Sequence, residues 1–363
     1  MRSVRSPRRL AVALAFALTI ALTASACGST KSDTATTTAS GQPGVPHLTI
    51  GYVDLLAAGA YQKRTYDVFS AAAKSLGWTI NYVDAAGDPA AAETAVQGFV
   101  TQRVDAIIDS AVDTNLIRPG LLAAKQAGIP VINVAGQDPP GPAHALLAAD
   151  YGENEADLFG PLAAKIVSDL PRGSKIAVLK TSLFFAARPR QQVIDEAAAK
   201  AGIIVVSDLE LPFDVTAATK KISDLLLANP DIEAVVSVFD VWTVAALAAI
   251  KAAGRTNRVK VYSAYADSIN LPLMRQDPNI VGLADGTQAA GAAVAVDQLL
   301  YFFARKTPID PHPAAAAFTY GIVTRANMPP PGQDGPVSVQ DLVAPFLAKW
   351  KADFGNTAIG SKG

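Results

Sequence analysis

Short apolar runs rich in β-branched residues alternate with longer segments of helical periodicity from residue 48 to residue 305. The runs that predict strands are residues 48–53, 79–83, 106–109, 131–134, 175–179, 203–207, 234–238 and 259–263. The segments that predict helices are residues 61–76, 90–102, 115–127, 156–170, 191–201, 216–228, 243–253 and 286–305. This alternation requires crossover connections and parallel sheets that helices cover on both faces. The predicted fold class is therefore α/β.

The chain is long enough for two such sheets. A break in composition at residues 137–142 (QDPPGP) and the length of 363 residues favour two lobes over one large sheet. Ligands of open α/β sheets bind beyond the carboxyl ends of the strands, where loops lead into helices. The loops that follow predicted strands are rich in aromatic and charged groups; they are residues 54–61, 110–115, 135–141, 181–190, 239–242, 264–267 and 285–288. With two lobes face to face, these loops would line one cleft.

Residues 1–26 have the order of a secretory signal peptide. Four arginines precede an apolar run over residues 10–22, and three small residues come directly before Cys27, the only cysteine. The run is too short for a comfortable membrane span. A cysteine in this place resembles a bacterial lipoprotein signal, in which it becomes the lipidated N-terminus, although Ala24 stands where that pattern has Leu. The alternative is an ordinary signal peptide with an incidental cysteine, and in either case residues 27–46 have the composition of a flexible tether.

Composition and missing motifs argue against several classes of function. Without the arginines of residues 1–26 the formal charge changes from −1 to −5, and a mildly acidic body argues against a nucleic acid partner. If Cys27 carries lipid, no thiol is left for a disulfide or for nucleophilic catalysis. The common catalytic and nucleotide-binding motifs are absent. We therefore predict no enzymatic activity, no cofactor and no metal site, with a hydrolase that uses Asp113, Asp240 and Asp285 as the alternative.

Four stretches of the sequence carry a family resemblance. They are LTIGYVD with a following helix that ends in KSLGW, VDAIIDSAVDTNLI followed by AKQAGIPVINV, AARPRQQVIDEAAAKAG, and NPDIEAVVSVFDVWTVAALAAIKAAG. In their order and spacing they resemble periplasmic binding proteins of the ribose-binding-protein-like, sugar-binding type, over residues 48–304. The same fold occurs in gene regulators of the lactose-repressor type, but the DNA-binding helix pair of those proteins is absent here.

The resemblance implies two lobes that close by hinge motion over one small molecule, with crossings near residues 149–150, 284–285 and 311–315. The N-terminal lobe would comprise residues 47–149 and 285–313, the C-terminal lobe residues 150–284 and 314–330, and residues 331–363 would form a loop and a helix. The implied ligand is a sugar or polyol, delivered to the permease subunits of an ABC transporter. The protein would be a monomer, lipid-anchored on the extracytoplasmic side of the cell membrane. A non-sugar ligand, such as a nucleoside, amino acid derivative or aromatic, and a sensor that signals to a membrane receptor are the alternatives.

The same resemblance transfers two polar residues to a ligand site. Arg190, in the AARPR run, matches the family's position for an arginine that binds sugar hydroxyls, and its planar fork can hold two oxygens at once. The alternative is a surface arginine in the first turn of a helix, where a cation is mildly unfavourable. Arg188 is the second candidate. Asp113 falls where the family has an aspartate, although a helix start would explain it equally well.

Other positions depart from the family's pattern. Ala135 and Gly136 replace an Asp-Arg pair, Phe239 replaces an Asn before Asp240, Tyr265 replaces an aspartate, and Asp285 replaces a glutamine. These changes remove polar contacts and add aromatic faces. We therefore expect a ligand that is less hydroxylated than ribose, or differently shaped.

Aromatic and acidic loop residues complete the predicted site. The rings are Tyr61, Phe184, Phe185, Phe239, Trp242 and Tyr265, of which Tyr265 and Trp242 are preferred to Phe185. Rings in a cleft can stack on the apolar face of a sugar, and the alternative is burial in the core. Asp240 and Asp285 are the acidic candidates. Each has an alternative as a helix cap, Asp240 alone and Asp285 in a capping box with Gln288.

Overall fold

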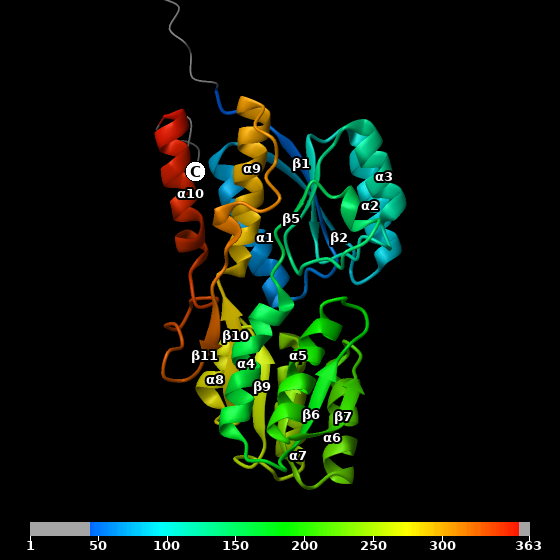
Figure 1. The fold of residues 1–363 in the computed structure, drawn as a ribbon, viewed down its shortest axis with the longest axis vertical. Helices are drawn as coiled ribbons and strands as arrows, with labels where there is room; N and C mark the ends of the chain where they lie inside the picture. The colour runs from blue at the N-terminus through cyan, green and yellow to red at the C-terminus, as the bar shows by residue number, and fades with distance from the viewer. Residues whose placement is uncertain (1–43, 356–363) are drawn as a thin grey trace, which may run out of the picture. The chain divides into compact units, whose positions relative to one another are not determined.

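The computed structural model describes residues 44–355, so that Cys27 and the predicted signal peptide lie outside the described residues. The strands of this range form two separate sheets, which confirms the predicted α/β class with two parallel-sheet lobes (Figure 1). We name the lobe built on the first sheet the N-terminal lobe and the lobe built on the second sheet the C-terminal lobe. Of the helices in residues 44–355, none combines the length and the apolar character that a membrane span requires.

The N-terminal lobe contains a five-stranded parallel sheet in the order β2-β1-β3-β4-β5. Its strands are β1 (Thr49–Asp54), β2 (Thr79–Asp84), β3 (Ala106–Ser110), β4 (Val131–Asn133) and β5 (Ala149–Asp150). The helices between them are α1 (Ala60–Ser75), α2 (Pro89–Gln102) and α3 (Arg118–Ala127). All residues of β3 are buried because strands flank it on both sides and helices cover its faces.

The C-terminal lobe contains a six-stranded sheet in the order β11-β10-β9-β8-β6-β7. Its strands are β6 (Lys175–Lys180), β7 (Ile204–Glu210), β8 (Ile232–Ser237), β9 (Lys260–Ala264), β10 (Ile280–Gly286) and β11 (Tyr320–Val323). The helices of this lobe are α4 (Glu155–Asp169), α5 (Ala187–Ala201), α6 (Val215–Ala228), α7 (Thr243–Ala252) and α8 (Asn270–Gln276). The edge strand β11 pairs with β10 in the antiparallel direction, so this sheet is not wholly parallel.

The described chain passes between the two lobes at four places. It leaves the N-terminal lobe between β5 and α4, returns between β10 and α9 (Gly291–Arg305), and enters the C-terminal lobe again before β11. After β11 it returns a last time, because α10 (Val339–Phe354) packs against α1 and α9 (Figure 1). The resemblance implied three crossings, and α10 supplies the fourth.

Several helices begin shortly after the carboxyl end of a strand, and two of the starts carry Asn154 and Arg190. Asn154 caps α4 by accepting hydrogen bonds from the backbone N–H groups of Ala156 and Asp157, both at 3.0 Å. Four short 3-10 helices lie in loops of residues 44–355: His144–Leu146, Asp240–Trp242, Gln288–Ala290 and Ala314–Ala316. The helix predicted from residue 191 begins at Ala187, so that Arg190 lies in its first turn. The helix predicted from residue 286 begins only at Gly291, after a 3-10 turn.

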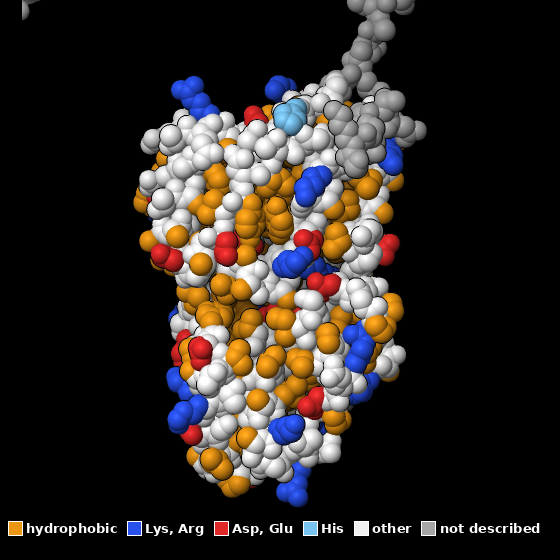
Figure 2. All heavy atoms as spheres, turned by 180° about the vertical axis from the view of Figure 1, so that it is seen from behind, with side chains coloured by type: hydrophobic (Ala, Val, Ile, Leu, Met, Phe, Trp, Pro, Cys, Tyr) orange, Lys and Arg blue, Asp and Glu red, His pale blue; other side chains and the backbone are white. Residues whose placement is uncertain are grey.

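The face of the molecule opposite to that of Figure 1 is shown in Figure 2. Hydrophobic side chains lie across much of this face, and acidic and basic groups are scattered among them. The basic groups of this face are not gathered into one patch, which a nucleic acid surface would require.

Candidate functional site

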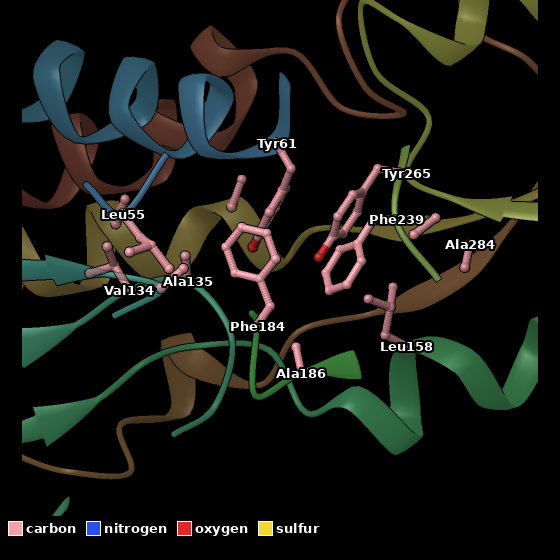
Figure 3. Packing of buried hydrophobic residues seen from close by; sticks show 14 of the residues in the cluster. Leu55, Tyr61, Val134, Ala135, Leu158, Phe184, Ala186, Phe239, Tyr265 and Ala284 are labelled. Atoms are coloured by element: carbon pink, nitrogen blue, oxygen red, sulfur yellow. The ribbon is translucent and has the colours of Figure 1, made fainter. Parts of the chain in front are cut away.

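Two tyrosines from different lobes stack face to face where the carboxyl ends of the two sheets meet. Tyr61 lies at the start of α1 and Tyr265 follows β9, and their ring centroids are 4.1 Å apart with an interplanar angle of 13° (Figure 3). Both phenols donate hydrogen bonds of 2.8 Å to the carboxylate of Glu153. Burial raises the pKa of Tyr61 and of Tyr265 well above the usual value, so both keep their protons and remain donors.

Arg190 lies at the centre of this contact and is only 1% exposed. Its Nε donates to Glu155 Oε2 at 2.5 Å, its Nη1 to the carbonyl oxygen of Val238 at 2.8 Å, and its Nη2 to Glu153 Oε1 at 3.2 Å. Nη2 also donates to the hydroxyl of Tyr265. Burial alone would lower the pKa of Arg190, but Glu155 and Tyr265 together raise it above its usual value. The guanidinium is therefore charged and held within the protein.

Aromatic rings surround the same guanidinium. Its central carbon lies 4.7 Å from the ring centroid of Phe239, 5.0 Å from that of Tyr265 and 5.3 Å from that of Phe159. Figure 3 shows Tyr61, Tyr265, Phe184 and Phe239 grouped together where the ribbons of the two lobes meet. Cation–π contacts of this kind strengthen when water is excluded. Arg190 is thus a buried, pre-ordered cation in an aromatic cluster.

Glu153 and Glu155 are site residues that the sequence analysis missed. Glu153 lies in the segment that connects β5 to α4, and Glu155 is the first residue of α4; the two side chains are 1% and 4% exposed. Glu153 Oε2 also accepts a 2.7 Å hydrogen bond from the backbone N–H of Gly136. The available signal was two acids flanking a capping Asn directly after a strand, which is where a ligand site of an α/β sheet is expected.

Two cavities adjoin this cluster. The smaller, of about 20 Å³, lies among Tyr61, Glu153, Arg190, Phe239 and Tyr265 and has room for about one water molecule. The larger has a volume of about 750 Å³, within the range of small-molecule sites. Its wall includes Asp113, Gln137, Asp138 and His144 of the N-terminal lobe and Asn154 of the connecting segment. From the C-terminal lobe it includes Glu155, Lys180, Phe184, Phe185, Arg188 and Gln191. Phe184 and Phe185 line both cavities.

The structure separates the predicted polar residues into two groups. Asp113 lines the larger cavity, and it starts no helix: its Oδ1 accepts a 2.8 Å hydrogen bond from the N–H of Asn115 in a turn, and α3 begins only at Arg118. Arg188 is exposed and lines the same cavity. Asp285 lines neither cavity; its carboxylate is paired with Arg64, with Nη1 3.1 Å from its Oδ2, and accepts further hydrogen bonds within the protein.

The capping alternatives for the two acids do not hold in the structure. Asp285 belongs to β10, and its Oδ1 accepts a 2.7 Å hydrogen bond from the side chain of Gln288 without capping a helix. Asp240 is the first residue of a 3-10 turn and lies beside Asp267. Burial raises the pKa of both carboxyl groups, and the charge of Asp240 raises that of Asp267 further.

Trp242 lies in the core of the C-terminal lobe. It is 1% exposed, lines neither of the two cavities, and donates from its indole N–H to the carbonyl oxygen of Pro212 at 3.0 Å. Its ring packs on Phe213 and Phe239, at centroid distances of 5.9 and 5.7 Å. Phe239 is the one of these rings that reaches the smaller cavity. Within residues 44–355, no three His, Cys, Asp or Glu side chains gather as a metal ion would require.

Comparison with known proteins agrees with this architecture. The profile of the family described as periplasmic binding protein domain matches residues 54–304. The ribose import binding protein of Bacillus subtilis is 28% identical over 184 residues, which are 50% of this chain and 59% of that protein. The D-ribose/D-allose-binding protein of Pseudomonas aeruginosa is 25% identical over 257 residues, 69% of this chain and 77% of that protein. The match thus spans about three fifths of the first relative's length and more of the second's.

Solved structures share the fold. A solute-binding protein of an ABC transporter from Mycobacterium smegmatis, with bound glycerol, has a TM-score of 0.66 and 23% identity, covering 78% of this chain and 96% of that one. The Caulobacter myo-inositol binding protein, bound to myo-inositol, has a TM-score of 0.70 and 16% identity, covering 78% and 95%. At these identities the likeness concerns the fold alone. Because the family profile matches residues 54–304, well over half of the sequence, the chain belongs to the periplasmic binding protein family.

Proposed function

We propose that this protein captures a sugar or polyol between its two lobes outside the cytoplasm and delivers it to an ABC importer. The observation that carries the proposal is the cavity of about 750 Å³ between post-strand loops of both lobes, next to the buried cluster of Arg190, Glu153 and Glu155. The names of the relatives support it, because two of them are ribose-binding proteins and two similar structures hold glycerol and myo-inositol. Family membership also argues for binding rather than catalysis.

The proposed ligand contacts follow from the position of the cavities. Phe184 and Phe185 provide apolar faces that border both cavities. The rings of Tyr265 and Phe239 make cation–π contacts with the guanidinium of Arg190. The four hydrogen bonds that Arg190 donates to Glu155, Val238, Glu153 and Tyr265 use four of its five N–H groups, so one Nη1 hydrogen is left for a ligand oxygen. Further contacts of Arg190 with a ligand require that hydroxyl groups replace Glu153 or Tyr265. Trp242 is left out of the proposed site.

A ligand screen tests the proposal. The chain from residue 28 onward is heated with sugars, polyols, amino acids, nucleosides and small aromatics, and each hit is measured by calorimetry. A ligand at a hundred times its Kd raises the free energy of unfolding by about 2.7 kcal/mol, which a thermal-shift assay detects. Binding confined to sugars and polyols supports the proposal. Selective binding of amino acids, nucleosides or aromatics would replace it with one of the alternative ligand classes.

Hinge closure and the membrane anchor are parts of the same proposal. Small-angle scattering should give a smaller radius of gyration with a ligand from the screen than without it, because closure brings the lobes together. The basic, apolar and small-residue segments before Cys27 support a lipid on that cysteine. Cys27→Ser should release the protein from the membrane or leave its precursor uncleaved, since acyl chains are the proposed anchor. Unchanged membrane retention and processing of this variant would rule the anchor out.

A further inference from the structure

The buried cluster beside the larger cavity contains two acids and one base. Glu153 and Glu155 share the single guanidinium of Arg190, which approaches Glu155 at 2.5 Å and Glu153 at 3.2 Å. All three side chains are at most 4% exposed. If both acids are ionised, the trio has one negative charge in excess. A buried charge without a partner is costly, so this site requires either a proton or a second cation.

One atom of the cluster has no hydrogen-bond partner. Glu155 Oε2 accepts from Arg190, but Glu155 Oε1 is buried and unpartnered. Glu155 belongs to the wall of the cavity of about 750 Å³, whereas Glu153 belongs to the wall of the smaller one. Glu155 thus lines a cavity and has one oxygen without a hydrogen-bond partner, which indicates a place for a donor group of a ligand.

The charged groups around Glu155 favour a cationic donor. Toward the N-terminal lobe the cavity is lined by Asp113 and Asp138, and Asp150 acts electrostatically on Glu155. The basic residue of that wall, His144, has its Nε2 3.3 Å from Oδ2 of Asp150 and is therefore already paired.

The bases on the opposite wall do not neutralise Glu155. Lys180 forms an ion pair with Asp208. Arg188 is exposed to solvent, where a charge acts over a short range only. The wall of the cavity thus has more acids than free bases.

We propose that the ligand of this cavity is an amino-substituted sugar or polyol, whose protonated amine binds Glu155 Oε1. The inference rests on the proposed function and narrows its ligand class. An ammonium group would supply both the missing hydrogen bond and the missing positive charge, while the hydroxyl groups of the same molecule reach Asp113, Asp138 and Gln137. A neutral polyol would supply the hydrogen bond alone.

The proposal predicts that a proton is released from Glu155 when the amine binds. Burial, opposed by Arg190 and assisted by Glu153, raises the pKa of Glu155 to about 8, so the free protein holds a proton there at neutral pH. An ammonium group bound at Oε1 would lower that pKa and expel the proton. Binding of an amine that is already protonated in solution should therefore release close to one proton at about pH 7. Binding of a neutral polyol to the protonated acid should release none.

Matched ligands test the proposal on the unaltered protein. D-glucosamine, D-glucose and N-acetyl-D-glucosamine form one set, and an aminocyclitol, its parent inositol and its N-acetyl derivative form a second. Calorimetry in buffers of different ionisation enthalpy measures both affinity and proton release. We expect the amine to bind about ten to a hundred times more tightly than its parent and its N-acetyl derivative in at least one set. Equal or tighter binding of the parent would overturn the amine proposal and leave the proposed function standing, whereas no binding in either set and none by any sugar or polyol in the screen would overturn both.

A matched pair of variants tests whether the preference for the amine depends on Glu155. Glu155→Gln removes the acid that would ionise when the amine binds, and it should reduce the amine-to-parent ratio to about one. Glu233→Gln makes the same chemical change on an exposed residue at the start of β8, and it should leave the ratio unchanged. An amine preference that survives in Glu155→Gln would show that the amine binds elsewhere. If Glu155→Gln fails to fold, the affinities and the proton release of the unaltered protein decide the question alone.

Discussion

Arg64 of α1 and Asp285 of β10 form an ion pair between the lobes whose two side chains are completely buried, with Nη1 and Oδ2 3.1 Å apart. Arg64 Nη2 also lies 3.5 Å from the carbonyl oxygens of Gly286 and Val337. This one side chain therefore contacts two of the four passages of the chain between the lobes. Asp285 additionally accepts a 2.8 Å hydrogen bond from the N–H of Ala266, which fixes the loop that carries Tyr265.

Arg64→Ala should lower the free energy of unfolding by about 3–5 kcal/mol, because it leaves Asp285 buried without its cation. Urea unfolding measures the change. Lys220→Ala is the matched control, since the pair of Lys220 with Asp224 is exposed and should contribute at most about 1 kcal/mol. The double variant Arg64→Ala with Asp285→Ala should be less costly than the sum of the single changes. Equal losses for Arg64→Ala and Lys220→Ala would contradict the role of the buried pair.

Arg190→Lys should weaken the site without abolishing its charge. Lysine cannot present three nitrogen atoms in a plane to Glu153, Glu155 and Val238 at once, so we expect a loss of about 1.5–3 kcal/mol in the free energy of unfolding. Ligand affinity, measured by calorimetry on a hit from the screen, should fall about tenfold or more. Arg188→Lys is the control for stability, because that side chain is exposed. Parent-like stability and affinity of Arg190→Lys would mean that the planar fork of Arg190 is not required.

Asp54→Asn should remove part of the pH dependence of stability. Burial, reinforced by Asp84 and opposed by the N–H of Leu56, raises the pKa of Asp54 from 3.8 to about 7. Between these values the folded state holds a proton that the unfolded state has lost, so the parent loses stability as the pH rises, by about 1.4 kcal/mol per pH unit. Urea unfolding at about pH 5 and about pH 7 should therefore show a smaller decrease for Asp54→Asn than for the parent. The exposed Asp224→Asn should follow the parent, and an identical slope in all three proteins would refute the assignment.

Gly152 and Gly98 should respond to alanine in opposite directions. A Cβ at Gly152 would lie 2.2 Å from the carbonyl oxygen of Gly136. The backbone of Gly136 cannot move away without disturbing the hydrogen bond that its N–H donates to Glu153. We expect Gly152→Ala to lower the free energy of unfolding by about 1–3 kcal/mol. Gly98 lies within α2, and a Cβ there would be 3.9 Å from Nε2 of Gln102, an ordinary contact, so Gly98→Ala should raise it by about 0.5–1 kcal/mol. Thermal unfolding distinguishes the two, and a stabilised Gly152→Ala would show that the two loops are not tightly packed.

The α/β class could be predicted from the sequence because strand and helix periodicity are local properties. The position of Arg190 was equally accessible, since it depends on a loop that follows a strand. The partners of Arg190 could not be predicted in this way. Tertiary packing brings a buried guanidinium to its carboxylates, and Glu153 is 37 residues from Arg190 in the sequence. β10 was missed as a strand because Gly282 and Gly286 interrupt its apolar run.

Burial of individual rings was also beyond the sequence. A tryptophan in a loop can line a cleft or be buried in the core. Burial requires that an acceptor is available to its indole N–H. For Trp242 that acceptor is Pro212, 30 residues earlier in another loop. The fourth passage and the packing of α10 against α1 depend in the same way on contacts between segments about 280 residues apart.

The return of α10 to the N-terminal lobe determines which labels can report on lobe movement. β1 and α10, the first strand and the last helix of the described chain, both belong to that lobe. A pair of fluorophores attached at residues 47 and 355 would move as one body when the lobes close, and energy transfer between them would stay constant. A reporter of closure needs one dye on the C-terminal lobe, for example at the exposed Leu227 of α6, and its partner on α10 or α2.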